Sequence, residues 1–497
     1  MSAGSVDLTD VDRLGAIPDS VLRGLGLRLR AIGLTPRFLA QLGRVGDRLD
    51  DALRAPMRIW NARRAREPAA AVARLFMLHD AVTADEARAA LGELAPMTDG
   101  GLVEETDRGF VSQFQLALAE DAFCFGDSPG SRGDPVLPIC GATLDLVRAA
   151  LPGRQVNSVL DVGCGAGAVA LLLARTARRV VATDVSPRAL AFARVNAVLN
   201  GVTNVEFRRG DLFEPVKGER YERVAAQPPF IALRDGVAAS TFIHGGKRGD
   251  ELALRLLTGA QSHVAPGGRA IVLADWPLVD GDEIHERVRR ACGDASAHVL
   301  VLQSPAKNIE DYCTIHAAVE HRELGDDFSR AAIAQREHFY EQGIRGVAFA
   351  LVVVEPAGTA EGWTSHLAVR HTSDVPISAE AVDRLMAARN LANSRGDELG
   401  GARLRLPDGA RLVQQPMPNS PDPAIVLHPP AGRPEWPAVF DASSAAILAR
   451  LAEAPTVFGA ARAIARETGA PLEATSFRVA GVARDALLKG ALDIAWP

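Results

Sequence analysis

Residues 134–356 predict a doubly wound α/β fold, and the segments on either side predict further domains. The first observation is an alternation of short apolar runs with helical stretches, which is typical of a parallel or mixed sheet covered on both faces. The second is a glycine-rich turn directly after the first apolar run. The expected strands are 158–162, 180–183, 205–209, 223–226, 269–274, 298–303 and 347–355.

Residues 1–125 are expected to form a mostly helical N-terminal domain. Apolar residues recur there at helical spacing, and Thr83-Ala-Asp-Glu86 has the form of a capping box that begins a helix. The run 101–116, with turn formers at Asp107-Arg-Gly109, predicts a hairpin. Helices followed by a hairpin are the order of a winged helix. Such a domain could contact nucleic acid, or it could form a dimer or shield a substrate. The acidic net charge of the chain favours dimerisation or substrate shielding.

The third segment, 357–497, is expected to be a C-terminal accessory domain, and turn formers at 125–133 predict the linker before the α/β domain. Prolines in 416–423 and 428–437 predict extended or turn segments, because each proline disfavours the helical conformation of the residue before it. Helices are expected from Asp441 onward and around 460–468 and 476–488, which together predict a second small helical or winged-helix-like module.

The bulk composition restricts the expected partners and location. A net charge of −6 over 497 residues gives no overall attraction to phosphate backbones or anionic membranes. The five cysteines show no C-x-x-C pair and no histidine spacing typical of zinc, so no metal is expected and a reducing, cytoplasmic setting is favoured. The sequence shows neither a signal-peptide pattern nor an apolar run of about 20 residues, so no membrane association is expected.

The glycine-rich turn, Val159-Leu-Asp-Val-Gly-Cys-Gly-Ala-Gly-Ala168, is expected to bind a ligand at the start of a helix over 168–177. Gly163, Gly165 and Gly167 allow a tight turn and a close approach of the backbone to the ligand. Nicotinamide and flavin enzymes use similar turns, so the glycines alone do not choose the ligand. Asp161 favours a ligand with an ammonium group, because its carboxylate would repel a pyrophosphate.

With Asp161, the turn resembles the first motif of the class I S-adenosylmethionine-dependent methyltransferases, and the resemblance covers about 134–356. It implies a Rossmann-like sheet, S-adenosylmethionine as cofactor, and cofactor-binding roles for Asp161, Gly163, Gly165, Gly167, Asp184, Asp211, Leu212 and Gln227. Asp184 would bind the ribose hydroxyls, Asp211 would lie near the adenine amino group, and Leu212 would line the ring. Each acid alone also fits an ordinary cap or turn residue, but their order at successive strand ends favours the cofactor site.

Gln227-Pro-Pro-Phe230 follows the fourth expected strand and resembles the Asn-Pro-Pro-Tyr/Phe motif of amino-directed methyltransferases. These include the small-domain and protein glutamine enzymes and the nucleic-acid adenine or guanine enzymes. The prolines stiffen the loop. Gln227 and the carbonyl of Pro228 would accept both hydrogens of a planar NH2, and Phe230 would stack on the acceptor. Glutamine adds a methylene to the family's asparagine, which would displace the acceptor by about 1 Å unless the loop compensates. A structural Pro-Pro turn is the alternative.

The glycine-rich segment 241–251 and the region after it hold further candidates. His244 would assist or bind the substrate, or would be an ordinary loop histidine. Lys247 and Arg248 would meet an anionic acceptor or remain solvated charges. Trp276 would cover the pocket or pack in the core.

Three functions remain open on the sequence. The first is a methyltransferase acting on a planar or amide-like nitrogen of a protein, peptide or nucleic acid, with the flanking domains recognising a still unidentified acceptor. The second is a methyltransferase of a small metabolite, with nitrogen or oxygen as acceptor and an N-terminal domain that forms a homodimer. The third is a nucleic-acid-binding regulator that senses the cofactor, against which the acidic charge and the intact acids argue.

Overall fold

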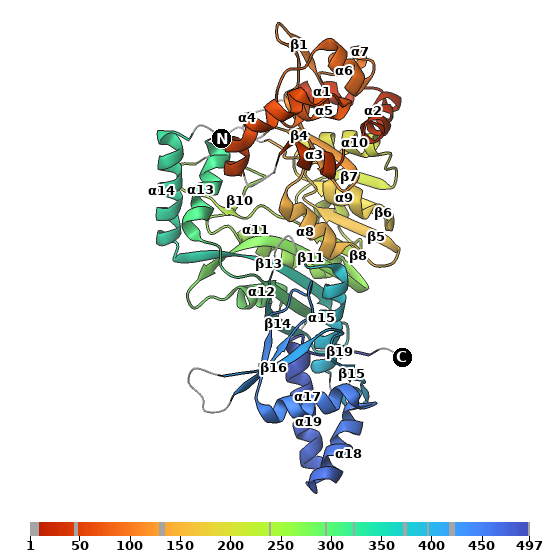
Figure 1. The fold of residues 1–497 in the computed structure, drawn as a ribbon, viewed down its shortest axis with the longest axis vertical. Helices are drawn as coiled ribbons and strands as arrows, with labels where there is room; N and C mark the ends of the chain where they lie inside the picture. Colours follow the sequence, from red (N-terminus) through yellow and green to blue (C-terminus); the bar gives the residue numbers. More distant parts are fainter. Residues whose placement is uncertain are drawn as a thin grey trace.

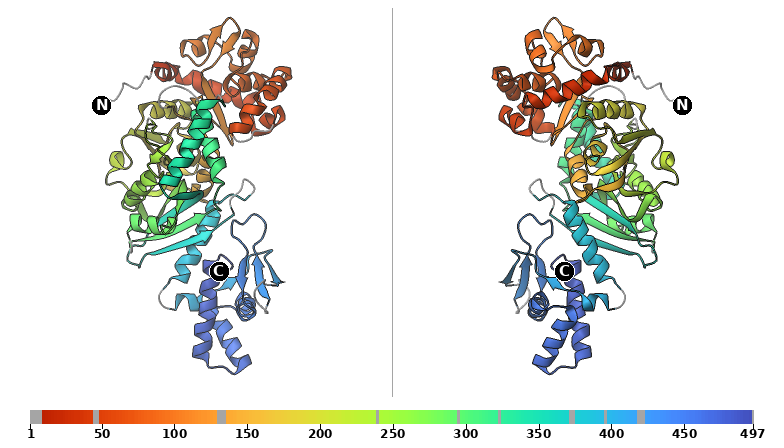
Figure 2. Two further views of the ribbon diagram at one scale, coloured as in Figure 1. Left: turned by 90° about the vertical axis from the view of Figure 1, so that its left-hand side faces the viewer. Right: turned by 90° about the vertical axis from the view of Figure 1, so that its right-hand side faces the viewer.

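The structure is a computed structural model that places three regions along one long axis. The N-terminal helices and the C-terminal module lie at opposite ends of the sheet domain in all three views (Figures 1 and 2). The structure describes residues 9–43, 48–128, 135–237, 240–293, 296–321, 324–370, 375–394, 397–416 and 423–495.

An eight-stranded sheet forms the middle region. Its strands, in spatial order, are β14 (Trp363–Ala368), β12 (Ala297–Gln303), β13 (Ile344–Pro356), β11 (Val264–Val279), β8 (Tyr221–Ala226), β5 (Val156–Val162), β6 (Ala177–Asp184) and β7 (Val205–Arg209). All neighbouring strands are parallel except β13, which runs antiparallel to both β11 and β12. The seven expected strands are therefore confirmed, within a few residues at their ends.

Alternating side chains of the strands face two separate helical layers. Val159 and Val180 belong to the core beneath α8, α9 and α15, whereas Leu160 and Val181 belong to the core beneath α11 and α12. The helices of this region are α8 (Gly141–Ala150), α9 (Ala168–Leu173), α10 (Pro187–Asn200), α11 (Glu251–Ala260), α12 (Ile284–Cys292), α13 (Ile309–Glu320), α14 (Asp326–Glu341) and α15 (Ala379–Ala392). A short parallel pair, β9 (Ile231–Ala232) and β10 (His244–Gly246), lies beside the sheet. The helix after the glycine turn is shorter than expected, because β6 already begins at Ala177.

The N-terminal region consists of helices followed by two hairpins. Its elements are α1 (Thr9–Gly15), α2 (Asp19–Ala31), α3 (Pro36–Leu42), α4 (Arg48–Arg64), α5 (Pro68–Phe76), α6 (Ala84–Leu91), α7 (Ala95–Asp99), β1 (Glu104–Thr106), β2 (Gly109–Val111), β3 (Phe114–Ala119) and β4 (Ala122–Asp127). The capping box of Thr83 and Glu86 is confirmed. The expected single strand after the turn is divided at Ser112, whose buried hydroxyl donates to the Leu102 carbonyl and accepts the Phe114 amide. The winged-helix assignment stays a prediction.

Helix α10 fastens the N-terminal region to the sheet domain. The Arg188 guanidinium donates to both carboxylate oxygens of Asp10 at 2.7 and 2.8 Å, and its Nε donates to Asp127 at 2.8 Å. Asn196 donates to the Phe125 carbonyl of β4 and accepts the Phe125 amide, each at 2.8 Å. Because Arg188 and Asp127 are largely shielded from water, these contacts hold β4 against α10 more firmly than exposed ion pairs would.

The C-terminal region begins later than the expected boundary at 356, because β14 extends the sheet and α15 packs on α8. Its elements are α16 (Glu398–Gly401), β15 (Leu404–Arg405), β16 (Arg411–Gln415), β17 (Ala424–His428), β18 (Ala438–Phe440), α17 (Ala442–Glu453), α18 (Val457–Thr468), α19 (Leu472–Leu488) and β19 (Asp493–Ile494). A separate core joins them, except β16, whose residues are exposed. The expected helix start at Asp441 is confirmed, since this carboxylate caps α17 through the Ser444 amide. Most of the proline segment 416–423 lies outside the described residues.

Two features are absent from the described residues. None of the helices there is long and apolar enough to cross a membrane. The same part of the chain holds no group of three or more histidine, cysteine, aspartate or glutamate side chains arranged to bind a metal ion.

Candidate functional site

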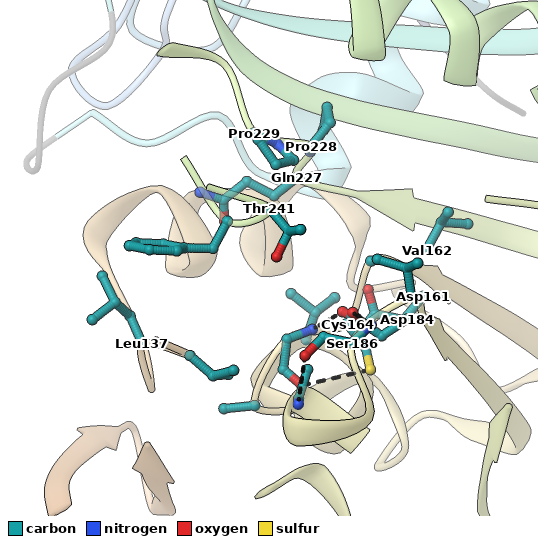
Figure 3. A pocket seen from close by; sticks show the side chains of 18 of the residues that line it. Leu137, Asp161, Val162, Cys164, Asp184, Ser186, Gln227, Pro228, Pro229 and Thr241 are labelled. Atoms are coloured by element: carbon teal, nitrogen blue, oxygen red, sulfur yellow. Dashed lines mark hydrogen bonds between the residues drawn. The ribbon is translucent and has the colours of Figure 1, made fainter. Parts of the chain in front are cut away.

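A cavity of about 260 Å³ lies at the carboxyl ends of β5, β6 and β8, where ligands bind in open α/β sheets. It is lined by the glycine turn, by the residues that follow β6, β7 and β8, and by segment 135–140. Gln227 and Thr241 lie at one end of the cavity, and Asp161 and Asp184 lie at the other (Figure 3). The two motifs that the sequence singled out therefore share one cavity.

The glycine turn has the backbone that its sequence predicts. Gly163, Gly165 and Gly167 have φ values of 72°, 54° and 87°, in the left-handed region that glycine tolerates best. A Cβ atom on Gly163 or Gly165 would meet nothing within 4 Å, so both backbones border open space. At Gly167 the same atom would lie 3.0 Å from the Cβ of Ala193, because α10 packs closely there. The first two glycines thus leave room for a ligand, whereas the third allows the helix to pack.

Asp161 is a buried carboxyl group at the edge of the cavity, with 1% of its surface exposed. Its Oδ2 accepts the Ala170 amide of α9 at 2.9 Å. Burial, with a smaller contribution from the nearby Asp184 carboxylate, raises the pKa of Asp161 to about 7 even though the Ala170 hydrogen bond lowers it. A cationic ligand at this point would favour the charged carboxylate.

Asp184 ends β6 and accepts two backbone amides. Its Oδ2 accepts from Gly165 and its Oδ1 accepts from Ser186, each at 2.8 Å. Ser186 in turn caps α10 through the Ala189 amide. These bonds join the glycine turn to the next helix and fix the carboxylate at the cavity wall.

Asp211 and Leu212 line the cavity after β7. Asp211 is half exposed and forms an ion pair with Arg255 of α11. Leu212 has a φ of 45°, which is unusual for a branched side chain, and its carbonyl accepts the Thr183 hydroxyl at 3.3 Å. The backbone is therefore held in a strained conformation at the cavity edge.

Gln227 lines the cavity after β8, and Pro228 and Pro229 follow it along the wall. The Gln227 Oε1 accepts the Thr143 hydroxyl at 3.1 Å, and its Nε2 donates to the Cys140 Sγ at 3.5 Å. Both polar ends of this amide are thus bonded to the start of α8.

The other candidates lie away from the cavity. Phe230, expected to stack on the acceptor, does not line it among the described residues and packs instead against the core around α11. Trp276 is fully buried in the same core, so it packs in the core and does not cover the pocket. Arg248 forms an ion pair with Asp282 at 3.1 Å, and the His338 ring bonds to the Lys247 carbonyl at 2.8 Å.

The remaining loop candidate, His244, lies in β10 outside the cavity lining described, and its Nδ1 accepts the Ser240 amide at 3.0 Å. Further lining residues were not predicted from the sequence, namely 135–140, Thr143, Thr241 and Phe242, and of these Cys140 and Thr143 bond to Gln227. The apolar run Pro135-Val-Leu-Pro-Ile139 was the available signal, but only the fold shows that it lines the cavity.

The charge of the cavity wall is one-sided. Its described lining includes the carboxyl groups of Asp161, Asp184 and Asp211 and includes no lysine, arginine or histidine. The acceptor end is lined by apolar side chains such as Leu137 and Phe242. The carboxyl groups favour a cationic ligand at their end of the cavity and disfavour phosphate, and the apolar side chains favour a neutral ligand next to it.

A carboxylate-lined cavity at the carboxyl ends of a mostly parallel sheet, beside a glycine turn, defines a nucleotide-type cofactor site of the α/β class. Comparison with known proteins narrows this class. Residues 142–290 match the family described as methyltransferase small domain, and residues 42–113 match a family described only as a domain of unknown function.

Two relatives that are protein glutamine methyltransferases by name agree with this match. The release factor glutamine methyltransferase of Xylella fastidiosa (strain 9a5c) is 39% identical over 130 residues, which are 24% of this chain and 46% of that protein. A putative protein N5-glutamine methyltransferase of Methanocaldococcus jannaschii is 30% identical over 122 residues, which are 24% of this chain and 61% of that protein. A solved SAM-dependent methyltransferase from Agrobacterium tumefaciens has a TM-score of 0.29 and 16% identity, over 50% of this chain and 71% of that one. The chain spans about half the length of the Xylella relative.

The chain therefore contains a class I S-adenosylmethionine-dependent methyltransferase domain, similar to the protein glutamine methyltransferases, and S-adenosylmethionine is its cofactor. The cavity fits this cofactor, because open space borders the backbones of Gly163 and Gly165 and carboxyl groups line the same end. A sulfonium and an ammonium are both attracted by such a wall.

Proposed function

We propose that this protein is an enzyme that methylates a planar amide nitrogen in a protein, with a glutamine side chain as the first candidate acceptor. The observation that carries the proposal is that Gln227 and the carboxylates Asp161 and Asp184 line one cavity from opposite ends. The resemblance of this domain to protein glutamine methyltransferases supports the same acceptor. A soluble protein acceptor and reduced cysteines favour a cytoplasmic location.

The cofactor end is proposed to act as the sequence predicted. Asp161 would meet the ammonium of the methionine moiety, with Gly163, Gly165 and Gly167 shaping the turn around it. Asp184 would accept the ribose hydroxyls, because its carboxylate is already fixed by two amides and faces the cavity. Asp211 would lie near the adenine amino group and Leu212 against the ring, as their place at the cavity edge allows.

At the acceptor end, Gln227 and the Pro228 carbonyl would accept the two hydrogens of the substrate amide. Bound S-adenosylmethionine supplies an electrophilic methyl group on a sulfonium. An amide nitrogen is a weak nucleophile, because its lone pair is delocalised into the carbonyl. Two hydrogen bonds from the NH2 group would hold the acceptor in the attacking geometry, and positioning of this kind accounts for much of enzymatic rate enhancement. The apolar wall would limit water around the nitrogen during the transfer. The N–C bond would form as the S–C bond of the sulfonium breaks, which leaves S-adenosylhomocysteine, and the proton would then pass from the methylated nitrogen to solvent water.

The charge of the wall favours a protein acceptor over a nucleic acid. No basic side chain is present in the described lining that could meet a phosphate. The neutral side chains Leu137, Phe242 and Thr241 suit an uncharged amide and an adjoining peptide segment.

The test is transfer of labelled methyl groups from S-adenosylmethionine to fractionated cell extract, followed by mass spectrometry of the labelled residue. Label in glutamine of a protein is the expected result, and label only in nucleic acid or in small molecules would contradict the proposal. Gln227→Ala should lower turnover while cofactor binding survives. Gln414→Ala, on the exposed strand β16, is the matched control and should change neither.

The cofactor roles have a separate test by calorimetry. Asp184→Ala should weaken S-adenosylmethionine binding by about 1–3 kcal/mol, the scale of a lost charge-assisted hydrogen bond. Asp107→Ala, in the exposed β1–β2 turn, should leave the affinity unchanged. An unchanged affinity in Asp184→Ala would refute the ribose assignment.

A further inference from the structure

The start of helix α8 makes a closed set of contacts with the acceptor loop, here called the α8 latch and consisting of Cys140, Thr143 and Gln227. The Thr143 hydroxyl donates to the Gln227 Oε1 at 3.1 Å, and the Gln227 Nε2 donates to the Cys140 Sγ at 3.5 Å. The Cys140 amide donates to the Thr143 Oγ1 at 3.4 Å, and the Cys140 Sγ lies 3.3 Å from the same oxygen, which closes the set. All three residues line the cavity.

The latch leaves the Gln227 amide oxygen able to accept a hydrogen bond from the substrate, as the proposed reaction needs. A carboxamide oxygen has two lone pairs and its nitrogen carries two hydrogens. Thr143 occupies one lone pair and Cys140 occupies one hydrogen. In this orientation of the amide, one lone pair of Oε1 therefore stays available to a substrate NH2 group.

The latch also suits a glutamine. This side chain has one more rotatable bond than asparagine, so its amide needs an additional restraint to hold a fixed position. Thr143 and Cys140 supply that restraint from a helix, which is more rigid than a loop. Shortening the side chain by one methylene would withdraw the amide from α8 by about 1 Å, beyond good hydrogen-bond range.

We propose that Thr143, supported by Cys140, is a positioning residue that orients the Gln227 amide for the acceptor and is matched to glutamine at this position. This proposal rests on the proposed function, because it assigns a role in the same methyl transfer. Thr143 itself would touch neither the cofactor nor the acceptor nitrogen.

The kinetic test compares Thr143→Val, Thr143→Ser and the control Thr258→Val, whose exposed hydroxyl bonds only within α11. Thr143→Val keeps the shape and removes the donor. It should lower kcat by about tenfold, less than the roughly hundredfold loss that a 1 Å misplacement can cause, while KM and the Kd of S-adenosylmethionine change by less than about twofold. Thr143→Ser should restore kcat, and Thr258→Val should leave it unchanged.

A double-variant cycle separates the latch from a merely structural role. In a Gln227→Asn background the amide no longer reaches α8, so adding Thr143→Val should have no further effect on kcat. An equal loss in both backgrounds would overturn the proposal, because Thr143 would then act without Gln227. An unchanged kcat in the single variant would overturn it as well.

A spectroscopic arm tests the latch without any methyl acceptor. The side-chain NH2 resonance of Gln227, identified by its loss in Gln227→Ala, is followed in the full-length protein labelled with 15N-glutamine. The resonance should shift in Thr143→Val and return in Thr143→Ser. If it stays in place, the latch is refuted even where methyl transfer is observed. If it shifts while no protein acceptor is methylated, the latch stands and the proposed function fails.

Discussion

The buried carboxyl group of Asp161 predicts that cofactor binding and proton release are coupled. Burial holds the pKa of this group at about 7 in the protein, against a usual value of 3.8. The ammonium of S-adenosylmethionine is expected to bind the charged carboxylate only. Below the folded-state pKa, the affinity should therefore fall as the pH falls, because a proton must leave before the cofactor binds.

The size of the effect follows from the pKa. With a pKa of about 7, the charged fraction of Asp161 is about one half at pH 7 and about one hundredth at pH 5. The affinity should thus fall by about fiftyfold between these two values, or about 2.3 kcal/mol. An α-amino group titrates near pH 7.7–8.0, so the window from about pH 5 to pH 7 avoids most of the cofactor's own titration.

Calorimetry in two buffers of different ionisation enthalpy measures both the affinity and the number of protons released. At about pH 6 the wild-type protein should release close to one proton per cofactor bound. Asp161→Asn should bind weakly with neither the proton release nor the pH slope, and the exposed control Asp107→Asn should behave as the wild type. A change below about threefold between pH 5 and 7, or an equal slope in Asp161→Asn, would refute the reasoning.

The same carboxyl group makes the opposite prediction for stability without cofactor. The folded protein keeps the Asp161 proton up to about pH 7, whereas the unfolded chain loses it near 3.8. The folded state therefore binds more protons between these values, and the free energy of unfolding falls as the pH rises through this range. Over this range the free energy of unfolding should fall by at most about 4 kcal/mol, at about 1.4 kcal/mol per pH unit. The difference in this pH dependence between wild type and Asp161→Asn measures the effect.

Four further substitutions test the packing around the site. Arg188→Ala leaves the buried Asp127 carboxylate without its guanidinium and should cost about 3–5 kcal/mol, seen as faster hydrogen exchange in β4 and α10; unchanged exchange would contradict this. Gly167→Ala should destabilise the protein more than Gly163→Ala, because only the Gly167 substitution brings a methyl group to 3.0 Å from another side chain. Gly163→Ala should weaken cofactor binding more, since its methyl group enters open space beside the cavity. Thermal melting and calorimetry distinguish the two effects, and the reverse order would refute the assignment. Trp276→Ala should cost about 3–5 kcal/mol of stability, while the cofactor Kd measured below the melting range stays unchanged. A loss of cofactor affinity without a loss of stability would show instead that Trp276 covers the pocket.

The cofactor end of the site could be predicted from the sequence because its signals are local. The turn around Gly165 needs glycine at positions of positive φ. Asp161 is the second-last residue of β5, and Asp184 is the last residue of β6. The strands were predictable for the same reason, since buried apolar runs are read from neighbouring residues.

At the acceptor end, the Gln227-Pro-Pro loop could be predicted from its motif, but its partners could not, because they meet it only in the folded chain. Thr143 precedes Gln227 by 84 residues, and neither forms a recognisable pattern with the other. For Phe230 the motif suggested a stacking role, and the structure places this residue against the core around α11. The addition of β14 to the sheet edge likewise depends on pairing between distant strands.

The attachment of segment 135–140 has a consequence for how this protein can change or be divided. Val136 exchanges two hydrogen bonds with Asp127 at the end of β4, and Arg188 holds Asp127 in place. A fragment that starts at residue 134 would lose β4, and with it the hydrogen bonds that anchor Val136. Because Asn196 donates to the carbonyls of both Phe125 in β4 and Ala166 in the glycine turn, and Val136 and Ala166 share one core with the N-terminal helices, changes in the N-terminal region would reach the cofactor turn as well as segment 135–140.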